Sequence, residues 1–190
     1  MGAMILVVFH SVRFSVLNLI LTTVLLFFLA VSAAQADIEG FIGEYTGSAQ
    51  LEDVNGQIED RDLSVTISKA KDGFQVQWES VSHKSDGRSK SKSYSVDFQP
   101  SAREGIFSAA MQRNVFGHAV PLDPMKGEPF VWGRIVGETL TVFSLFVDQN
   151  GDYELQQFDR TLKDGGLQVE FQSVRNGVPQ RKVSAFLQRE

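Results

Sequence analysis

Two histidines are the side chains after residue 36 that are best suited to proton transfer or metal binding. His83 and His118 are 35 positions apart, and neither has a second histidine at the spacing of a metal site. The chain has no His-Glu-x-x-His run. We therefore expect no bound metal and no cofactor, and we keep the two histidines as candidate general bases.

An acidic stretch, Asp148–Glu154, resembles a calcium loop at first sight. Its glycine, Gly151, comes two positions too early for that motif, and the late acidic ligand is missing. We interpret the stretch as an Asn-Gly hairpin. The chain has no cysteine, which excludes disulfides, thiol catalysis and cysteine-bound metals, and no Gly-x-Ser-x-Gly motif is present.

Asp159 and Arg160 place opposite charges at adjacent positions of a predicted strand. Neighbouring side chains in a strand point to opposite faces, so one of the two charges must point inward and needs a partner. Two interpretations stay open: an ion pair near one end of the fold, or a polar anchor for the head group of a ligand. The candidate partners are Arg134, Glu154 and Arg181.

Aromatic side chains are the strongest indication of a binding site. Tyr45, Trp78, Tyr94 and Trp132 all fall at positions that we predict to face inward. Inward aromatic residues of a small barrel either fill its interior or line a pocket. The candidate ligand-binding residues are Tyr45, Trp78, Tyr94, Phe116, His118, Trp132 and Arg160.

The segments that carry these residues alternate apolar and polar side chains, as in Phe74–Trp78 and Leu167–Phe171. A period of two is typical of strands with one buried face. We find no amphipathic helix after Asp37. The predicted strands are 41–51, 61–70, 73–82, 91–99, 105–112, 130–136, 139–148, 152–161, 166–174 and 181–189.

Asn-Gly and Asp-Gly pairs separate many of these strands, for example Asp164-Gly165 and Asn176-Gly177. Such pairs favour tight hairpins between antiparallel neighbours. A meander of this length has exposed edges unless it closes, so we predict an all-β fold, an antiparallel up-and-down barrel of about eight to ten strands. A two-sheet β-sandwich is the alternative.

One connection, Gln112–Pro129, is long and holds three prolines within nine residues, which predicts no regular strand or helix there. It also carries Phe116 and His118. A long connection of this kind is often functional, so it is either a lid over a barrel mouth or a packed surface loop.

The first 36 residues have the three parts of a secretory signal peptide. Arg13 is the positive flank, an apolar run covers Phe14–Val31, and Ala34-x-Ala36 is a small-residue cleavage site. We expect cleavage before Asp37, no stable membrane span afterwards, and a periplasmic or secreted location. Residues 37–190 form the single predicted domain.

The charge balance bears on partners. Asp and Glu (23) outnumber Lys and Arg (18), for a formal net charge of −5. This argues against nucleic acid as a partner, because nucleic-acid binding needs a basic face. The basic run Lys84–Lys92 is a predicted hairpin tip, either solvated or in contact with an anionic surface.

The start of the predicted domain resembles a known family. Gly43 and Tyr45, within Phe41–Gly47, stand where lipocalins and other calycins have their Gly-x-Trp motif, and Asp152-Tyr153 is similar to a later lipocalin motif. The resemblance implies an antiparallel barrel that binds a small hydrophobic molecule. It also implies that an arginine of the last strand, here Arg181, packs on the opening aromatic residue.

These observations support three hypotheses. The leading one is an exported barrel that binds a small hydrophobic or amphipathic ligand such as a lipid. The second is a protein-interaction or envelope factor built on a solid barrel. The third is a barrel-type isomerase or cyclase with one acid or base, such as His118 or Glu154.

Overall fold

The computed structural model describes residues 37–52, 58–84, 86–109, 112–113, 119–120 and 122–190. These residues lie in one compact unit, Ala36–Glu190. The predicted leader 1–36 and the candidate site residues Phe116 and His118 are outside the described residues. Within the described part of the chain, no helix is long and apolar enough to cross a membrane.

Ten antiparallel strands of the described chain close into one barrel, in the order β1-β12-β11-β10-β9-β8-β5-β4-β3-β2. The predicted antiparallel up-and-down barrel is therefore confirmed, and the pairing of β1 with β12 replaces the open edges of a sandwich. The strands are β1 (Gly43–Glu52), β2 (Ile58–Ala70), β3 (Gly73–His83), β4 (Ser89–Pro100), β5 (Ile106–Ala109), β8 (Phe130–Val136), β9 (Thr139–Val147), β10 (Tyr153–Lys163), β11 (Gly166–Arg175) and β12 (Val178–Arg189).

The connection Gln112–Pro129 is more regular than predicted. The short strands β6 (Gln112–Arg113) and β7 (Ala119–Val120) pair with each other, and a 3₁₀ turn, η2 (Pro124–Lys126), follows. The prolines permit this because Pro124 stands in the first turn of η2, where a missing backbone N–H costs nothing. The Asp123 carboxylate caps that turn by accepting from the Met125 N–H at 2.9 Å. The expectation of no regular structure in this connection is thus wrong.

The β11–β12 hairpin shows why the Asn-Gly signals are reliable. Asn176 and Gly177 adopt φ values of 49° and 79°, which is the positive-φ pair that a tight hairpin turn requires. The Asn176 side chain makes two hydrogen bonds to the start of β10: its Oδ1 accepts from the Tyr153 N–H, and its Nδ2 donates to Asp152. The turn therefore fixes the ends of β10 and β11 as well as its own hairpin.

The hydrophobic core fills one end of the barrel, which we call the closed end. This end carries the β2–β3, β8–β9 and β10–β11 turns and a 3₁₀ turn, η1 (Glu39–Phe41). Alternate residues of each strand point inward there, as the period of two predicts. The largest buried apolar side chains are Phe41, Tyr45, Ile67, Phe74, Phe98, Leu140, Leu167 and Leu187.

The seam between β1 and β12 is short and lies at the closed end. Its register pairs Tyr45 with Arg189 and Thr46 with Gln188. Gly47 comes next, and a Cβ atom at that position would lie 2.6 Å from the Phe186 carbonyl oxygen. The absence of a side chain at Gly47 therefore allows β1 and β12 to approach closely enough to close the barrel.

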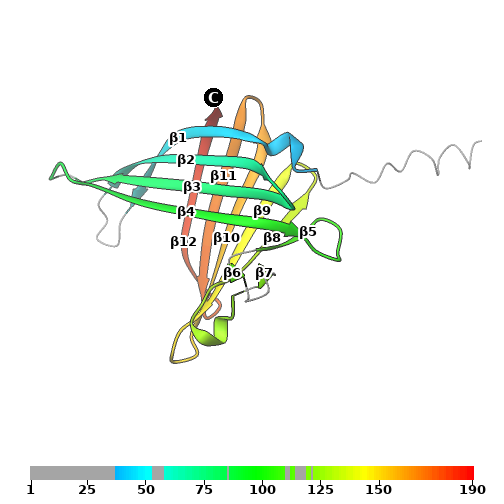
Figure 1. Cartoon of the computed structure of the whole chain (residues 1–190). Coiled ribbons are helices and arrows are strands. Elements are labelled where there is room, and N and C mark those ends of the chain that lie inside the picture. Colours follow the sequence, from blue (N-terminus) through cyan, green and yellow to red (C-terminus); the bar gives the residue numbers. More distant parts are fainter. Residues whose placement is uncertain (1–36, 53–57, 85, 110–111, 114–118, 121) are drawn as a thin grey trace, which may run out of the picture. The chain divides into compact units, whose positions relative to one another are not determined.

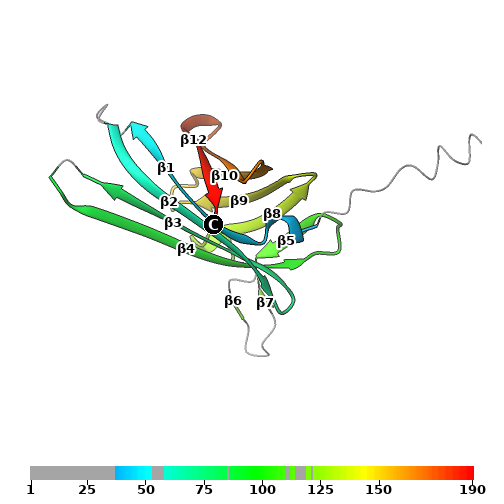
Figure 2. The ribbon, with the colours of Figure 1, turned by 90° about the horizontal axis from the view of Figure 1, so that it is seen from above.

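The other end, which we call the open end, carries the β3–β4, β9–β10 and β11–β12 turns. The ladders that join the two halves of the barrel do not extend to it: β4 pairs with β5 only from Phe98 to Pro100, although β4 begins at Ser89. Figure 1 shows β1–β4 crossing β9–β12 at a steep angle, and Figure 2 shows β2–β4 and β8–β9 diverging. Toward this end, the inward residues Lys90, Lys92 and Tyr94 of β4 are exposed, whereas Ser82 of β3 and Ser173 of β11 are buried.

Candidate ligand-binding site

A row of four aromatic rings crosses the interior of the barrel between the closed and open ends. Tyr94 stacks on its cross-strand partner Trp78 with ring centroids 5.3 Å apart. Trp78 lies 5.6 Å from Phe158, and Phe158 lies 4.7 Å from its own partner Phe171. This aromatic row, Tyr94-Trp78-Phe158-Phe171, joins β4, β3, β10 and β11.

The aromatic row separates two different environments. Below it, toward the closed end, lies the apolar core. Above it, the inner faces of β3, β9, β10 and β11 become polar, because the next inward positions along these strands are Ser80, Ser82, Ser144, Gln156 and Ser173. Tyr94 is 51% exposed, and the other three rings are half-buried. The row thus forms a floor at which the inner face of the barrel changes from apolar to polar, an arrangement that suits an amphipathic molecule.

Arg160 is the next inward residue of β10 below this floor, on the side of the closed-end core, and is 1% exposed. Its guanidinium carbon is 5.3 Å from the centre of the Trp78 ring and 5.8 Å from that of Phe158, which places both rings in cation–π contact with it. Its one hydrogen bond within the described chain is long, 3.5 Å from Nη1 to the Phe158 carbonyl oxygen. Burial lowers the pKa of Arg160 to about 10, an effect that the charge of Asp159 partly opposes.

The alternative of an ion pair involving Arg160 is wrong for the described residues. Asp159 is on the outer face of the barrel, where its carboxylate accepts from the Thr141 hydroxyl at 2.6 Å and from Gln157 Nε2 at 2.7 Å. Glu154 accepts instead from Gln156 at 2.8 Å. Asp159 points to the opposite face of β10 from Arg160, and Glu154, which shares the inward face of Arg160, lies six residues away toward the open end.

Tyr45 faces inward, as predicted, but below the floor. It is 1% exposed, and its hydroxyl donates to the Phe41 carbonyl oxygen at 2.9 Å. Burial raises the pKa of Tyr45, and the nearby Arg189 charge lowers it to a smaller extent. Tyr45 is therefore part of the closed-end core and ties η1 to β1.

The arginine over Tyr45 is Arg189 and not Arg181, so the expectation for Arg181 is wrong. Arg189 Cζ lies 5.6 Å from the centre of the Tyr45 ring, and its Nη2 donates to the Ile42 carbonyl oxygen. Arg181 is paired with Ser173, well toward the open end of β12. The last residue of β12, and not its first half, meets the start of β1.

Trp132 is on the outer face, which contradicts its predicted inward position. Val131 and Ile135 of the same strand are buried in the core, so Trp132 must point the other way. It stacks on Phe143 at 4.8 Å and lies 5.6 Å from Phe130. These three residues form an outer aromatic cluster on β8 and β9.

His83 ends strand β3 on the outer face and was expected in a loop. Its Nε2 lies 2.7 Å from Asp62 Oδ2, and its Nδ1 lies 3.1 Å from Ser89 Oγ. All three side chains are exposed on a sheet surface, which gives no enclosure for a substrate. Within the described residues, no group of acidic or histidine side chains could hold a metal ion.

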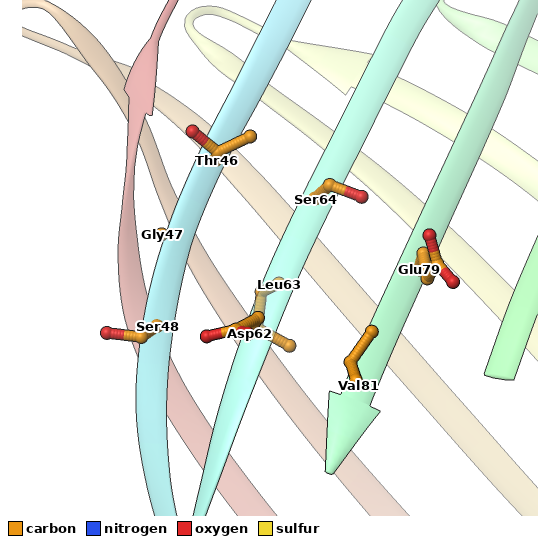
Figure 3. Close-up of a pocket in the computed structure, with 8 residues that line it drawn as sticks. All are labelled: Thr46, Gly47, Ser48, Asp62, Leu63, Ser64, Glu79 and Val81. Atoms are coloured by element: carbon orange, nitrogen blue, oxygen red, sulfur yellow. The ribbon is translucent and has the colours of Figure 1, made fainter. Parts of the chain in front are cut away.

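A shallow hollow of about 510 Å³ lies near this histidine, on the outer faces of β1, β2 and β3 (Figure 3). It is open to solvent and lined by both polar and apolar surface, so it does not enclose a ligand. Its lining residues are Thr46, Gly47, Ser48, Asp62, Leu63, Ser64, Glu79 and Val81.

The structure thus brings together three of the predicted site residues, Trp78, Tyr94 and Arg160, and adds Phe158 and Phe171. Phe158 shares its parity with Arg160, and Phe171 continues the inward series Leu167-Val169, so the alternation could have identified both. The closed antiparallel barrel is compatible with a calycin-like fold. No protein-family profile matches the chain, and no curated protein is significantly similar to it.

Proposed function

We propose that the protein is an exported binding module for a small amphipathic molecule, with the aromatic row as the floor of its binding site. The observation that carries the proposal is the change from aromatic to polar inner face at Trp78 and Phe158. A chain of apolar carbons can lie on the rings, and polar side chains above the rings and the Arg160 guanidinium below them can meet its polar atoms. Membership of the lipocalin-like barrels is part of this proposal.

The two tryptophans allow a direct test, because one lies in the proposed site and the other is outside it. Trp132→Phe leaves Trp78 as the single tryptophan, and Trp78→Phe leaves Trp132. Titration with dodecanol or laurate should change the emission of Trp78 saturably. The emission of Trp132 in the matched variant should stay constant. A saturable change at Trp132 alone, or at neither tryptophan, would contradict the proposal.

Export is tested separately by the mass of the protein recovered from the periplasm or medium. The proposal requires a chain that begins at Asp37. A chain that keeps residues 1–36 and fractionates with membranes would contradict cleavage of the leader.

A second candidate function, interaction with another protein, is favoured by the outer aromatic cluster Phe130-Trp132-Phe143. Met125, in the neighbouring turn η2, is 81% exposed. A photo-crosslinker at position 132 should then give a discrete adduct in cells, whereas one at Gln77, on the polar outer face of β3, should not. The barrel-type enzyme has less support, since the buried polar side chains of the described chain are Ser82, Thr141, Arg160 and Ser173, without an acid or a histidine.

A further inference from the structure

Among the residues that the structure describes, the charge of Arg160 has no counter-ion inside the barrel. Its side chain is 1% exposed, its Nε makes no hydrogen bond, and its one hydrogen bond within the described chain is the long contact to the Phe158 carbonyl oxygen. A buried charge without a partner is strongly unfavourable, and the face of an aromatic ring replaces only part of the lost hydration. The Arg160 guanidinium therefore has hydrogen-bond donors without an acceptor in the described chain.

The geometry of the guanidinium limits what that acceptor can be. Nε and the adjacent Nη atom form one planar edge with two parallel N–H donors, which matches the two oxygens of a carboxylate. Among the described residues, Arg160 is the one cation in contact with the Trp78 and Phe158 rings. A single positive charge is neutralised by a monoanion, whereas a dianionic phosphate would leave an excess charge buried.

The inner wall above the floor has more cations than acids, so its charge has the same sign as that of Arg160. The cations at inward positions there are Arg61, Lys90, Lys92, Arg175 and Arg181, and the acids are Glu59 and Glu154. Arg61 is paired with Glu59, and Arg175 with Asp148 and Asp152, so the cations left without an ion pair in the described chain are Lys90, Lys92 and Arg181. The chain as a whole has a net charge of −5. Acidic side chains instead dominate the outward positions of the strands, namely Glu44, Asp60, Asp62, Glu79, Asp97, Asp159 and Glu170. The interior is therefore attractive to anions in a protein that otherwise repels them.

We propose that the polar end of the ligand is a carboxylate and that it binds the planar edge of the Arg160 guanidinium. This inference rests on the proposed function and specifies the ligand class: a single-chain or compact apolar body with one carboxylate. The apolar body lies along the aromatic row. To reach Arg160 below the aromatic row, the carboxylate must pass between Trp78 and Phe158, so the proposal requires these two rings to move apart on binding.

The test compares laurate with dodecanol, which have the same chain length but differ in charge. The wild-type protein should bind laurate at least tenfold more tightly. Arg160→Met removes the charge with little change in side-chain volume. It should abolish the tenfold preference for laurate, which corresponds to about 1.4 kcal/mol. The affinity for dodecanol, which carries no charge, should change by no more than about twofold.

Arg181→Met is the matched control, because it removes an exposed cation from the same wall. This variant should keep the tenfold preference for laurate. The preference of the wild type should also persist in 0.5 M NaCl, since salt screens exposed charges much more than buried ones.

Equal binding of laurate and dodecanol by the wild type would overturn the inference and leave the proposed function standing. So would an unchanged preference in Arg160→Met, or its loss in Arg181→Met or in 0.5 M salt. Failure of the wild type to bind either molecule would overturn the proposed function itself. The salt experiment needs only the wild type, so the inference can be rejected even if Arg160→Met does not fold.

Discussion

Two arginines of this barrel rest on aromatic rings, and they differ in what else they touch. Arg189 lies over Tyr45 at the seam of the closed end and donates a hydrogen bond to the Ile42 carbonyl. Arg160 lies against Trp78 and Phe158 in the interior, with an Nε that has no acceptor. The same contact therefore serves structure where a hydrogen-bond acceptor is present, and leaves a cation available for a ligand where the acceptor is missing.

The largest effect should come from removing the ring beneath Arg189. Tyr45→Ala deletes a fully buried aromatic side chain and should lower the free energy of unfolding by about 3–5 kcal/mol. Tyr45→Phe keeps the ring and loses only the bond to the Phe41 carbonyl, so it should cost about 1 kcal/mol. Urea denaturation followed by far-UV circular dichroism measures both. Equal losses in the two variants would show that the ring does not support the seam.

The second arginine, Arg160, should show a change of opposite sign in the free energy of unfolding. Arg160→Met replaces an unpaired buried charge by an apolar side chain and should raise the free energy of unfolding by about 1–4 kcal/mol. Arg160→Lys keeps a buried charge and serves as the control, which should not be stabilised. A destabilised Arg160→Met protein would mean that Arg160 stabilises the fold as Arg189 does, and the contrast between the two would disappear.

Arg189→Met should have a smaller effect of about 1 kcal/mol, in the destabilising direction, because a cation–π contact and one hydrogen bond at an exposed side chain are lost. The variant should also raise the pKa of Tyr45 further, since the Arg189 charge lowers it in the wild type. Ultraviolet difference spectroscopy of tyrosine ionisation at alkaline pH measures this shift. An unchanged Tyr45 titration would contradict the proximity of the two groups.

The smallest effect is a pH dependence of the Arg160 penalty. The pKa of Arg160 is lowered to about 10 in the folded protein, well below its ordinary value, because the guanidinium is buried. Below pH 10 both folded and unfolded chains hold the proton, so the stability difference between wild type and Arg160→Met is constant. Between pH 10 and that ordinary value the unfolded chain binds more protons, so wild-type stability gains relative to the variant as pH rises.

At pH 10.5 this gain should be below about 1 kcal/mol. Urea midpoints of the two proteins at pH 8.5 and pH 10.5 give the difference. The other titrating groups are common to both proteins, so their contributions cancel in the difference between wild type and variant. A gap that widens with pH would contradict the direction of the Arg160 shift.

Alternation and turn chemistry were enough to predict the barrel, because the buried face of each strand repeats every second residue and Asn176-Gly177 adopts the turn expected of it. They also placed Trp78 and Tyr94 inside. They failed for Trp132 because Phe130–Val136 has apolar residues at both parities, so the pattern does not identify the inner face. Only the pairing of Phe107 with Gly133 and the burial of Val131 and Ile135 settle it.

The arginines show a different limit. The sequence requires Asp159 and Arg160 to face opposite sides but does not say which of them faces inward, because a buried charge is unfavourable in either case. The choice of Arg189 over Arg181 depends on the register between the first and last strands, which are more than a hundred residues apart. Such long-range register is set by close approaches such as that at Gly47, and it cannot be predicted from local sequence patterns.

The most direct test of a carboxylate held by Arg160 is the ¹³C NMR titration of laurate labelled at its carboxyl carbon and bound to the protein. We predict that the pKa of the bound carboxyl lies below that of free laurate, because the guanidinium stabilises its charged form. In Arg160→Met the same pKa should rise above the free value, since burial then acts without a cation. A bound carboxyl that titrates identically in both proteins would contradict the account.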